Sequence, residues 1–284
     1  MQTVLRPDLL AGRTALVTGG GTGLGLAMAR RFAGLGADLL LCGRRSAVLE
    51  EAAAAIRAET PGREVRTEIC DIRDAGAVQG MMQAAWDRGG IDILVNNAAA
   101  SFIAQTHHLS ARAADAILAP TMHGALYCTL EAGRRWIEAE RPGVVLNILS
   151  TSTLTGRAFT VPSAMAKAAV LAMTRSLAVE WGPRNIRLVA IAPGPFPTPG
   201  SQAQLSPAGR GGGAGAAVPL GRVGDHAELA ELAAFLVSDA AGYITGEQVV
   251  IDGGLHLRTS GAEDLLAWTD DRWAAHRDAL KRPG

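Results

Sequence analysis

Short apolar runs alternate with longer segments of helical periodicity along almost the whole chain, and this alternation most constrains the fold. Several of the short runs are continuously apolar, as strands are when both faces of a parallel sheet are covered. The alternation predicts an α/β fold, a doubly wound parallel sheet of about seven strands with helices on both faces. The expected strands are Thr14–Thr18, Asp38–Cys42, Glu64–Cys70, Ile91–Asn96, Val144–Leu149, Ile186–Ala192 and Gln248–Asp252. The expected helices are Leu24–Leu35, Ala47–Glu59, Ala75–Asp87, Ala111–Glu140, Ala164–Trp181 and His226–Ser238.

The chain has neither an internal repeat nor an interdomain linker, so residues 1–284 are expected to form one domain. Ser201–Pro219 is rich in glycine and small residues, which predicts a mobile loop on the substrate side. Residues 258–284 carry apolar side chains at helical spacing, including Trp268 and Trp273. This C-terminal helical tail is expected either to close its own domain or to pack over a pocket or a neighbouring subunit.

The charge balance argues against one broad class of partner. The 27 Lys and Arg residues are matched by 27 Asp and Glu, whereas nucleic-acid binding needs a surplus of cations. No apolar run approaches the roughly 18 residues that a membrane span needs, and the start MQTVLRPDLLAGR lacks the apolar core of a signal peptide. Cys42, Cys70 and Cys128 have no CxxC spacing and are expected to be reduced core thiols. We therefore expect a cytoplasmic protein with no nucleic-acid or membrane partner.

A glycine-rich turn, TGGGTGLG at residues 18–25, follows the first expected strand and leads directly into a helix. Glycines let the backbone turn tightly and approach a pyrophosphate. The N-terminus of the helix supplies free N–H donors and the positive end of the helix dipole. Glycine loops also serve as plain strand–helix turns, but the position of this one on the first βα unit predicts nucleotide binding.

The glycine spacing TGxxxGxG resembles that of the short-chain dehydrogenase/reductase family, and further motifs agree in order. They are Asn96-Asn97-Ala98, Ser150, Lys167, Pro193-Gly194 and Ile251-Asp252-Gly253-Gly254. The resemblance covers about residues 10–255 and implies a Rossmann-like fold with a nicotinamide cofactor. The cofactor-binding residues it implies are Gly19, Thr22, Gly23, Leu24, Arg44, Arg45, Asp71, Ile72, Asn97, Ala98, Lys167, Pro193, Gly194 and Phe196.

The residues after the second strand decide between NAD and NADP. An acidic side chain there would hold the ribose 2′-hydroxyl of NAD, but the sequence is Cys42-Gly43-Arg44-Arg45. Two guanidinium groups suit a 2′-phosphate, although two solvated arginines that open a helix are the alternative. NADP(H) is therefore the expected cofactor. Asp71 stands where the family accepts a hydrogen bond from the adenine amino group.

The catalytic positions depart from the family pattern. Ser150 and Lys167 are present, but Ser163 stands four residues before Lys167, where the family has a Tyr. In the family, that Tyr exchanges a proton with a carbonyl or alcohol while the Lys stabilises the phenolate and holds the nicotinamide ribose. An aliphatic hydroxyl is far less acidic than a phenol of pKa about 10, so Ser163 is a poor proton donor or base. Ordinary carbonyl reduction is therefore not expected.

SxxxK in place of YxxxK resembles the 2,4-dienoyl-CoA reductases within this family. The segments Asn97-Ala98-Ala99, Val161-Pro162-Ser163 and APGPFPT at 192–198 strengthen the likeness. The resemblance implies hydride transfer from NADPH to the far carbon of a conjugated dienoyl thioester of coenzyme A or a carrier protein. Hydrogen-bond donors would then stabilise the dienolate. It also implies a homotetramer, because family members pair two long helices across two-fold axes.

Further positions on the substrate side have diverged. Ser152 stands where the mitochondrial-type members hold the thioester oxygen with a Tyr, and His123 stands where they have an Asn. Thr121 replaces the helix Asn of the general family, and Pro120 beside it is expected to break or kink the helix. The expected catalytic residues are Lys167, Ser163, Ser150, Ser152 and His123, and the expected substrate contacts are Phe102, Ser152, Phe159 and Pro195.

Three functions are compatible with this pattern. The first is an NADP(H)-dependent reductase of enoyl or dienoyl thioesters. The second is a non-redox reaction on the same scaffold, such as dehydration, isomerisation or cyclisation. The third is a nucleotide-binding subunit without catalysis, because fold does not determine function. The remaining histidines are scattered without metal-ligand spacing, so no metal site is expected.

Overall fold

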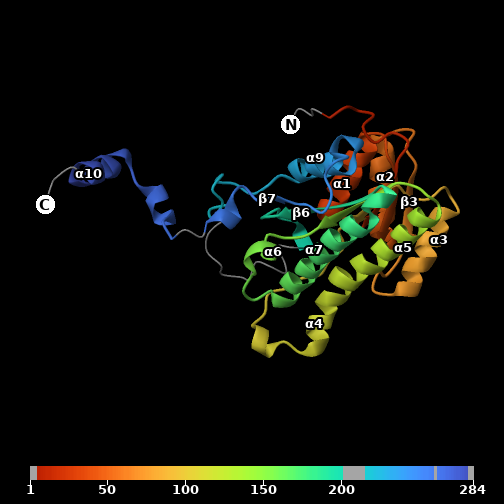
Figure 1. Ribbon diagram of the computed structural model, residues 1–284, viewed down its shortest axis with the longest axis horizontal. Coiled ribbons are helices and arrows are strands. Elements are labelled where there is room, and N and C mark those ends of the chain that lie inside the picture. The colour runs from red at the N-terminus through yellow and green to blue at the C-terminus, as the bar shows by residue number, and fades with distance from the viewer. Residues whose placement is uncertain (1–4, 201–214, 259–260, 281–284) are drawn as a thin grey trace.

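Seven parallel strands form one sheet in the order β3-β2-β1-β4-β5-β6-β7 (Figure 1). The computed structural model describes residues 5–200, 215–258 and 261–280. The strands are β1 (Thr14–Thr18), β2 (Asp38–Gly43), β3 (Val65–Ile69), β4 (Ile93–Asn96), β5 (Gly143–Ile148), β6 (Ile186–Pro193) and β7 (Gln248–Ile251). The chain runs outward from β1 to β3 and then crosses back to β4, beside β1. The carboxyl ends of β1 and β4 therefore flank the crevice in which doubly wound sheets bind ligands.

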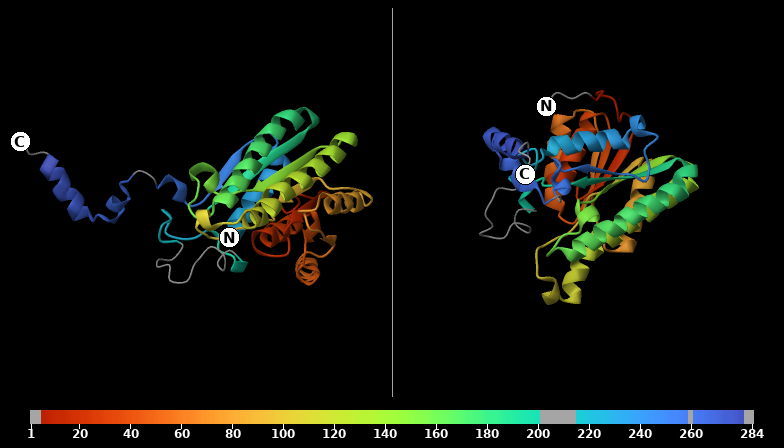
Figure 2. Two further views of the ribbon diagram at one scale, coloured as in Figure 1. Left: turned by 90° about the horizontal axis from the view of Figure 1, so that it is seen from below. Right: turned by 60° about the vertical axis from the view of Figure 1, so that its left-hand side comes forward.

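Helices cover both faces of this sheet (Figures 1 and 2). One face packs on α1 (Gly23–Gly34), α2 (Ser46–Glu59) and α9 (His226–Val237), and the other on α3 (Ala75–Trp86), α5 (Gly124–Glu138) and α7 (Val161–Trp181). Successive strand side chains enter opposite layers: Val17 lies in the first core and Leu16 in the second, and neither is exposed. Strand side chains are therefore buried on both faces of the sheet, as the continuously apolar strands predict. The predicted α/β architecture is confirmed.

The expected helix at 111–140 is divided. It comprises α4 (Ala111–Leu118), a π-helical turn at Ala119–His123, and α5. Pro120 cannot donate the backbone hydrogen bond that an α-helix requires, and the wider turn accommodates it without ending the helix. A short helix α6 (Ser152–Thr155), which the sequence pattern did not predict, follows β5.

The described part of the C-terminal tail, residue 258 and residues 261–280, includes one α-helix. Its helix α10 (Asp270–Leu280) lies beyond the edge of the body (Figure 2), and none of its residues is buried. Trp268 and Trp273 pack on each other with ring centroids 4.9 Å apart. The expectation of a mobile loop at Ser201–Pro219 falls mostly on residues 201–214, which lie outside the described residues. Val218, at the described end of that segment, is buried.

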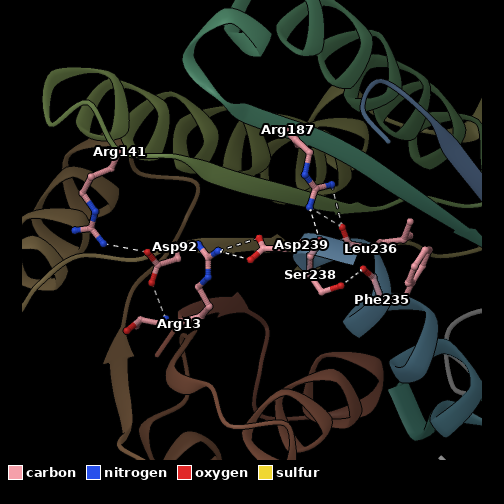
Figure 3. A network of polar contacts seen from close by, with 9 residues as sticks. Arg13, Asp92, Arg141, Arg187, Phe235, Leu236, Ser238 and Asp239 are labelled. Carbon is pink, nitrogen blue, oxygen red and sulfur yellow. Dashed lines mark hydrogen bonds and ion pairs between the residues drawn. The ribbon is translucent and has the colours of Figure 1, made fainter. Parts of the chain in front are cut away.

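Charged side chains hold the amino ends of the central strands together, opposite the ligand crevice (Figure 3). Asp92, just before β4, accepts from the Thr14 backbone N–H at 2.8 Å and from Arg141 Nη2 at 3.0 Å. Arg141 therefore ties the turn before β5 to β4, and Asp92 ties β4 to β1.

A second set of contacts fixes the end of α9 to the same edge of the sheet. Arg13 pairs with Asp239 at 2.9 Å, and Arg187 of β6 donates to the carbonyl oxygens of Leu236, Ser238 and Ile244 at 3.0–3.1 Å. A guanidinium among the last carbonyls of a helix satisfies acceptors that the helix leaves free. Burial lowers the pKa of Arg187 from its usual value.

A ladder of buried polar side chains crosses the centre of the sheet from α5 to α7. Asn96 Nδ2 donates to Thr129 Oγ1 and to Asn147 Oδ1, and Asn147 Nδ2 donates to Thr174 Oγ1, each at 2.9 Å. All four side chains are at most 5 % exposed. Buried amides and hydroxyls of this kind are costly to leave without a partner.

Replacing Asn147 by Ala is expected to lower the free energy of unfolding by about 2–4 kcal/mol, because it removes two hydrogen bonds from a buried polar network. Thr174→Val, at nearly constant shape, removes the two hydrogen bonds of Thr174 Oγ1, with Asn147 Nδ2 and with the Val170 carbonyl oxygen. It is expected to cost about 1–3 kcal/mol, because Asn147 Nδ2 is left buried without this acceptor. Urea unfolding at equilibrium measures both. Equal stability of Asn147→Ala and the unmutated protein would contradict a structural role for the ladder.

Candidate functional site

The turn between β1 and α1 leaves room and donors for an anion. Gly19 and Gly23 adopt positive φ angles of 66° and 55°, a region that glycine enters without strain. A Cβ atom on Gly25 would lie 2.4 Å from the carbonyl oxygen of Gly19, so a side chain is excluded there. Thr22, the N-cap of α1, makes no side-chain cap hydrogen bond. The first N–H groups of α1 are thus not taken up by their own cap and suit a pyrophosphate.

Hydrogen bonds from the loop after β4 close the other side of the crevice. Thr18 Oγ1 accepts from the backbone N–H groups of Asn97 and Ala98 at 3.0 and 3.1 Å, and donates to the carbonyl oxygen of Val95 at 3.1 Å. Asn97 Nδ2 donates to the Thr18 carbonyl oxygen at 2.9 Å. The structure therefore brings together Gly19, Asn97 and Ala98, which the sequence predicted to share one site.

Arginines dominate the edge where the second strand ends. Arg44 and Arg45 follow β2 directly, and both are exposed. Asp71, after β3, binds Arg73 through both carboxylate oxygens, with Arg73 Nε 2.9 Å from Oδ1. Arg73, and to a lesser extent Arg44, lowers the pKa of Asp71. Arg73 was not anticipated from the sequence, and a hydrogen bond from adenine to Asp71 stays a prediction.

Ile72 lies between this edge and the long helix. Its side chain is 6 % exposed, and a Cβ atom on Gly124 would come within 2.5 Å of its Cδ1. The contact leaves the backbone of Ile72 as the part that we expect to meet a cofactor.

Lys167 is the most unusual ionisable group of the site. It lies on α7, is 8 % exposed, and donates from Nζ to the carbonyl oxygen of Ile148 at 2.5 Å. Burial lowers the pKa of Lys167 to about 8, because removal from water disfavours the charged form. Ser163, one turn earlier on the same face of α7, is half-buried. Its hydroxyl has no hydrogen bond to any residue in the described part of the chain.

Two further hydroxyls lie at the end of β5. Ser150 Oγ accepts from the backbone N–H of Ser152 at 3.3 Å, and Ser152, the first residue of α6, is 9 % exposed. Thr153 Oγ1 is 2.9 Å from the Ser150 carbonyl oxygen and 2.7 Å from Gln248 Oε1 of β7. Thr153 and Gln248 hold α6 in place, and no spacing in the sequence pointed to this pair.

The π-helical turn carries Thr121 and His123 with different surroundings. Thr121 is 2 % exposed, and its Oγ1 accepts from the Ala100 backbone N–H at 3.1 Å. It therefore anchors the loop after β4. His123 is exposed and stacks on Tyr127 with ring centroids 6.1 Å apart. Within the described residues it makes no hydrogen bond to Lys167 or to the three serines, so its catalytic role stays a prediction.

The expected substrate contacts stand on the segments that follow β4, β5 and β6. Phe102 and Pro195 are half-buried, whereas Phe159 is 55 % exposed. The Ala104 backbone N–H donates to the Phe159 carbonyl oxygen at 2.9 Å, joining the loop after β4 to the loop before α7.

The loop after β6 is fixed against β7 and the segment before α9. Gly194 donates from its backbone N–H to the Ile251 carbonyl oxygen at 2.9 Å. Phe196 is 8 % exposed, and a Cβ atom on Gly224 would lie 2.3 Å from its ring. The ring is thus packed inside the loop, and we expect the backbone of Phe196 to be the part that meets a cofactor.

The described residues carry neither a cluster of metal ligands nor a membrane-spanning helix. No three His, Cys, Asp or Glu side chains there are arranged as metal ligands. None of the described helices combines the length and apolar character of a membrane span.

Comparison with known proteins decides the family. A family model described as enoyl-(acyl carrier protein) reductase matches residues 19–256. The chain belongs to the short-chain dehydrogenase/reductase family. It is 41 % identical over 291 aligned residues to an uncharacterized oxidoreductase of Caenorhabditis elegans, covering 98 % of this chain and 91 % of that protein. It is 39 % identical to a probable 2,4-dienoyl-CoA reductase of Bacillus subtilis, covering 86 % of this chain and 97 % of that protein.

Solved structures of the family agree with this assignment. A short-chain dehydrogenase from Bacillus anthracis shares 38 % identity with a TM-score of 0.77, over 87 % of this chain and 98 % of that chain. A putative 2-deoxy-D-gluconate 3-dehydrogenase from Agrobacterium tumefaciens, solved with bound NADP, shares 32 % identity with a TM-score of 0.81. That match covers 89 % of this chain and all of that chain. The short-chain dehydrogenase/reductase described here is therefore an oxidoreductase that resembles 2,4-dienoyl-CoA reductases.

The depressed pKa of Lys167 predicts a pH-dependent stability. Between about pH 8, the folded value, and its ordinary value of about 10.4, the unfolded chain binds a proton that the folded chain does not. Stability from this group therefore rises with pH across that window. We expect the unfolding free energy of the ligand-free protein, relative to Lys167→Met, to increase by roughly 2–3 kcal/mol from pH 7.5 to pH 10.5. A difference that is constant with pH in chemical denaturation would contradict the shift.

Proposed function

We propose that this short-chain dehydrogenase/reductase uses NADPH to reduce a conjugated enoyl or dienoyl thioester of coenzyme A. The observation that carries the proposal is the site itself: a buried Lys167 with Ser163 on the same helix face and Ser150 and Ser152 at the end of β5. The site offers hydrogen-bond donors without a phenol at the usual position. The relatives whose names include 2,4-dienoyl-CoA reductase support the substrate class.

Lys167 needs only its charge and position for its part. At pH 7 it is mostly protonated, because its pKa of about 8 lies above that pH. Its ammonium group keeps one hydrogen bond to the Ile148 carbonyl oxygen and has two further N–H groups with which to hold the nicotinamide ribose. It also adds positive charge near the acyl group, which favours a developing negative charge there.

Hydroxyl groups suit an enolate oxygen better than they suit proton transfer. Reduction of a conjugated thioester places negative charge on the thioester oxygen, and donors aimed at that oxygen stabilise it without losing their own protons. Ser163, Ser152 or both can supply such donors. His123 is the candidate for a third donor or for the proton source that completes the reduction. NADPH, when bound, supplies the hydride.

The proposed preference for NADP(H) rests on Arg44 and Arg45. Both are exposed where β2 ends, and no carboxylate follows that strand to hold a ribose 2′-hydroxyl. A guanidinium binds a phosphate through two parallel hydrogen bonds, which a hydroxyl cannot match. The homotetramer also stays a prediction.

Calorimetry is expected to show at least ~10-fold tighter binding of NADPH than of NADH, equivalent to about 1.4 kcal/mol. The double substitution Arg44→Ala, Arg45→Ala should remove this difference. Arg88→Ala is the matched control, since Arg88 is exposed near the amino end of β4 and far from the crevice. Equal affinities for the two cofactors in the unmutated protein would refute the assignment.

Oxidation of NADPH with a dienoyl-CoA, followed at 340 nm as about one NADPH per product, tests the chemistry directly. Ser152→Ala and His123→Ala should each lower kcat by about 10- to 1,000-fold if they hold the enolate oxygen. Ser163→Tyr should lower thioester reduction by obstructing the acyl group. A rise in alcohol–ketone activity in that variant would instead indicate a carbonyl reductase that has lost its phenol.

The proposal fails if both alanine variants keep full dienoyl-CoA reduction. It also fails if the unmutated protein oxidises no NADPH with any enoyl or dienoyl thioester. Product formation without net redox change would then identify a non-redox reaction on the same site.

A further inference from the structure

Phe159 has a backbone conformation that its position does not explain. Among the described residues, three that are not glycine have a positive φ: Glu140 at 50°, Asn185 at 58° and Phe159 at 64°. Glu140 follows the end of α5 and Asn185 caps the turn after α7, where left-handed residues commonly end helices. Phe159 ends no α-helix. A bulky aromatic residue in this region is strained, and such strain concentrates at ligand sites.

Contacts on both sides hold Phe159 in this conformation. Its carbonyl oxygen accepts from the Ala104 backbone N–H at 2.9 Å. The next residue, Thr160, is 4 % exposed and accepts from the Ala164 backbone N–H at 3.1 Å at the start of α7. Backbone hydrogen bonds therefore join the loop to the loop after β4 on one side and to α7 on the other.

The strain is not offset by burial of the aromatic ring. The Phe159 side chain remains 55 % exposed, although burying a phenylalanine ring is strongly favourable. In the sequence, Phe159 comes four residues before Ser163, and its hydrogen-bond partner Ala104 comes two residues after Phe102. The aromatic residue thus stands on the loop that joins α6, which begins at Ser152, to α7, which carries Ser163.

Exposed apolar residues stand on both helices that flank the loop. Leu154 on α6 and Met165 on α7 are 50 % and 57 % exposed, and these two helices pack against each other. The serines would engage the polar thioester end of a substrate, so an exposed apolar surface beside them suits the hydrocarbon end.

We propose that Phe159, hydrogen-bonded to Ala104, covers the apolar tail of the acyl thioester and so sets the preference for acyl-chain length. This inference rests on the proposed function for its substrate class. Phe159 then determines which acyl chains bind and takes no part in the reduction step.

The test measures binding, so that it does not depend on turnover. Calorimetry in the presence of NADP⁺ compares saturated, non-reducible acyl-CoAs from butanoyl-CoA to palmitoyl-CoA. Phe159→Ala should weaken palmitoyl-CoA binding by about 10-fold and butanoyl-CoA binding by less than about 2-fold. Phe159→Leu should fall between, and NADPH affinity should not change. Val179→Ala is the matched control, since Val179 is exposed at the far end of α7.

A second measurement tests the strain. Phe159→Gly removes the ring and also permits the positive φ, whereas Phe159→Ala removes the ring and keeps most of the strain. Thermal unfolding should therefore occur at the same or a higher temperature for Phe159→Gly than for Phe159→Ala. This reverses the order found where φ is negative.

The outcomes separate this inference from the proposed function. Losses in Phe159→Ala that are equal for short and long chains, or absent, overturn the inference even if the protein reduces dienoyl-CoA. Binding of acyl-CoAs with the expected chain-length loss, but without NADPH oxidation on dienoyl-CoA, overturns the proposed reduction and leaves the inference standing. A protein that binds none of these acyl-CoAs overturns it outright. A lower melting temperature for Phe159→Gly than for Phe159→Ala overturns the strain on which it is built.

Discussion

Asn96 and Asn147 hydrogen-bond each other between β4 and β5, in a part of the core that water does not reach. Each also binds a threonine on a covering helix, so α5, two strands and α7 are joined at one level. A one-residue slip of either strand would break this ladder and leave amide groups buried without partners. The pairing of the central strands is thereby specified more strictly than apolar packing alone could specify it.

The ladder lies directly beneath the site. Asn97 and Ala98 follow Asn96 in the chain, and Ile148, whose carbonyl oxygen binds Lys167, follows Asn147. The positions of the cofactor loop and of the buried ammonium group are therefore set by the same hydrogen bonds. The proposed stabilisation of an enolate depends strongly on such positioning, because it acts through geometry and low local dielectric.

The strands, their parallel direction and the glycine-rich turn after β1 were predictable from local patterns. Val17 and Leu16 enter opposite cores as the alternation requires, and Gly19 and Gly23 have the positive φ angles that a tight turn needs. Pro120 correctly marked a disturbance in its helix, but the sequence alone could not tell a π-helical turn from a break. Which of the two forms depends on the contacts that the loop after β4 makes with this part of the helix.

Other features depend on partners distant in the sequence. Thr153 is held by Gln248, ninety-five residues away, and Thr121 anchors Ala100 across the crevice. Phe159, which has a left-handed conformation, accepts a hydrogen bond from Ala104. No local periodicity encodes such contacts, because they form only when two loops from different strands meet.

Ion pairs and hydrogen bonds fix the edge of the sheet where the amino ends of the strands lie. Arg141 and Arg13 pair with Asp92 and Asp239 there, while Arg187 secures the end of α9. The opposite edge carries the longer loops, which hydrogen bonds join, such as those from Ala104 to Phe159 and from Ala100 to Thr121. Local opening is therefore expected to begin at the ligand edge and to leave strand register intact. Loops there can be exchanged or lengthened at little cost to the body, so the same sheet can host a different chemistry without being rebuilt.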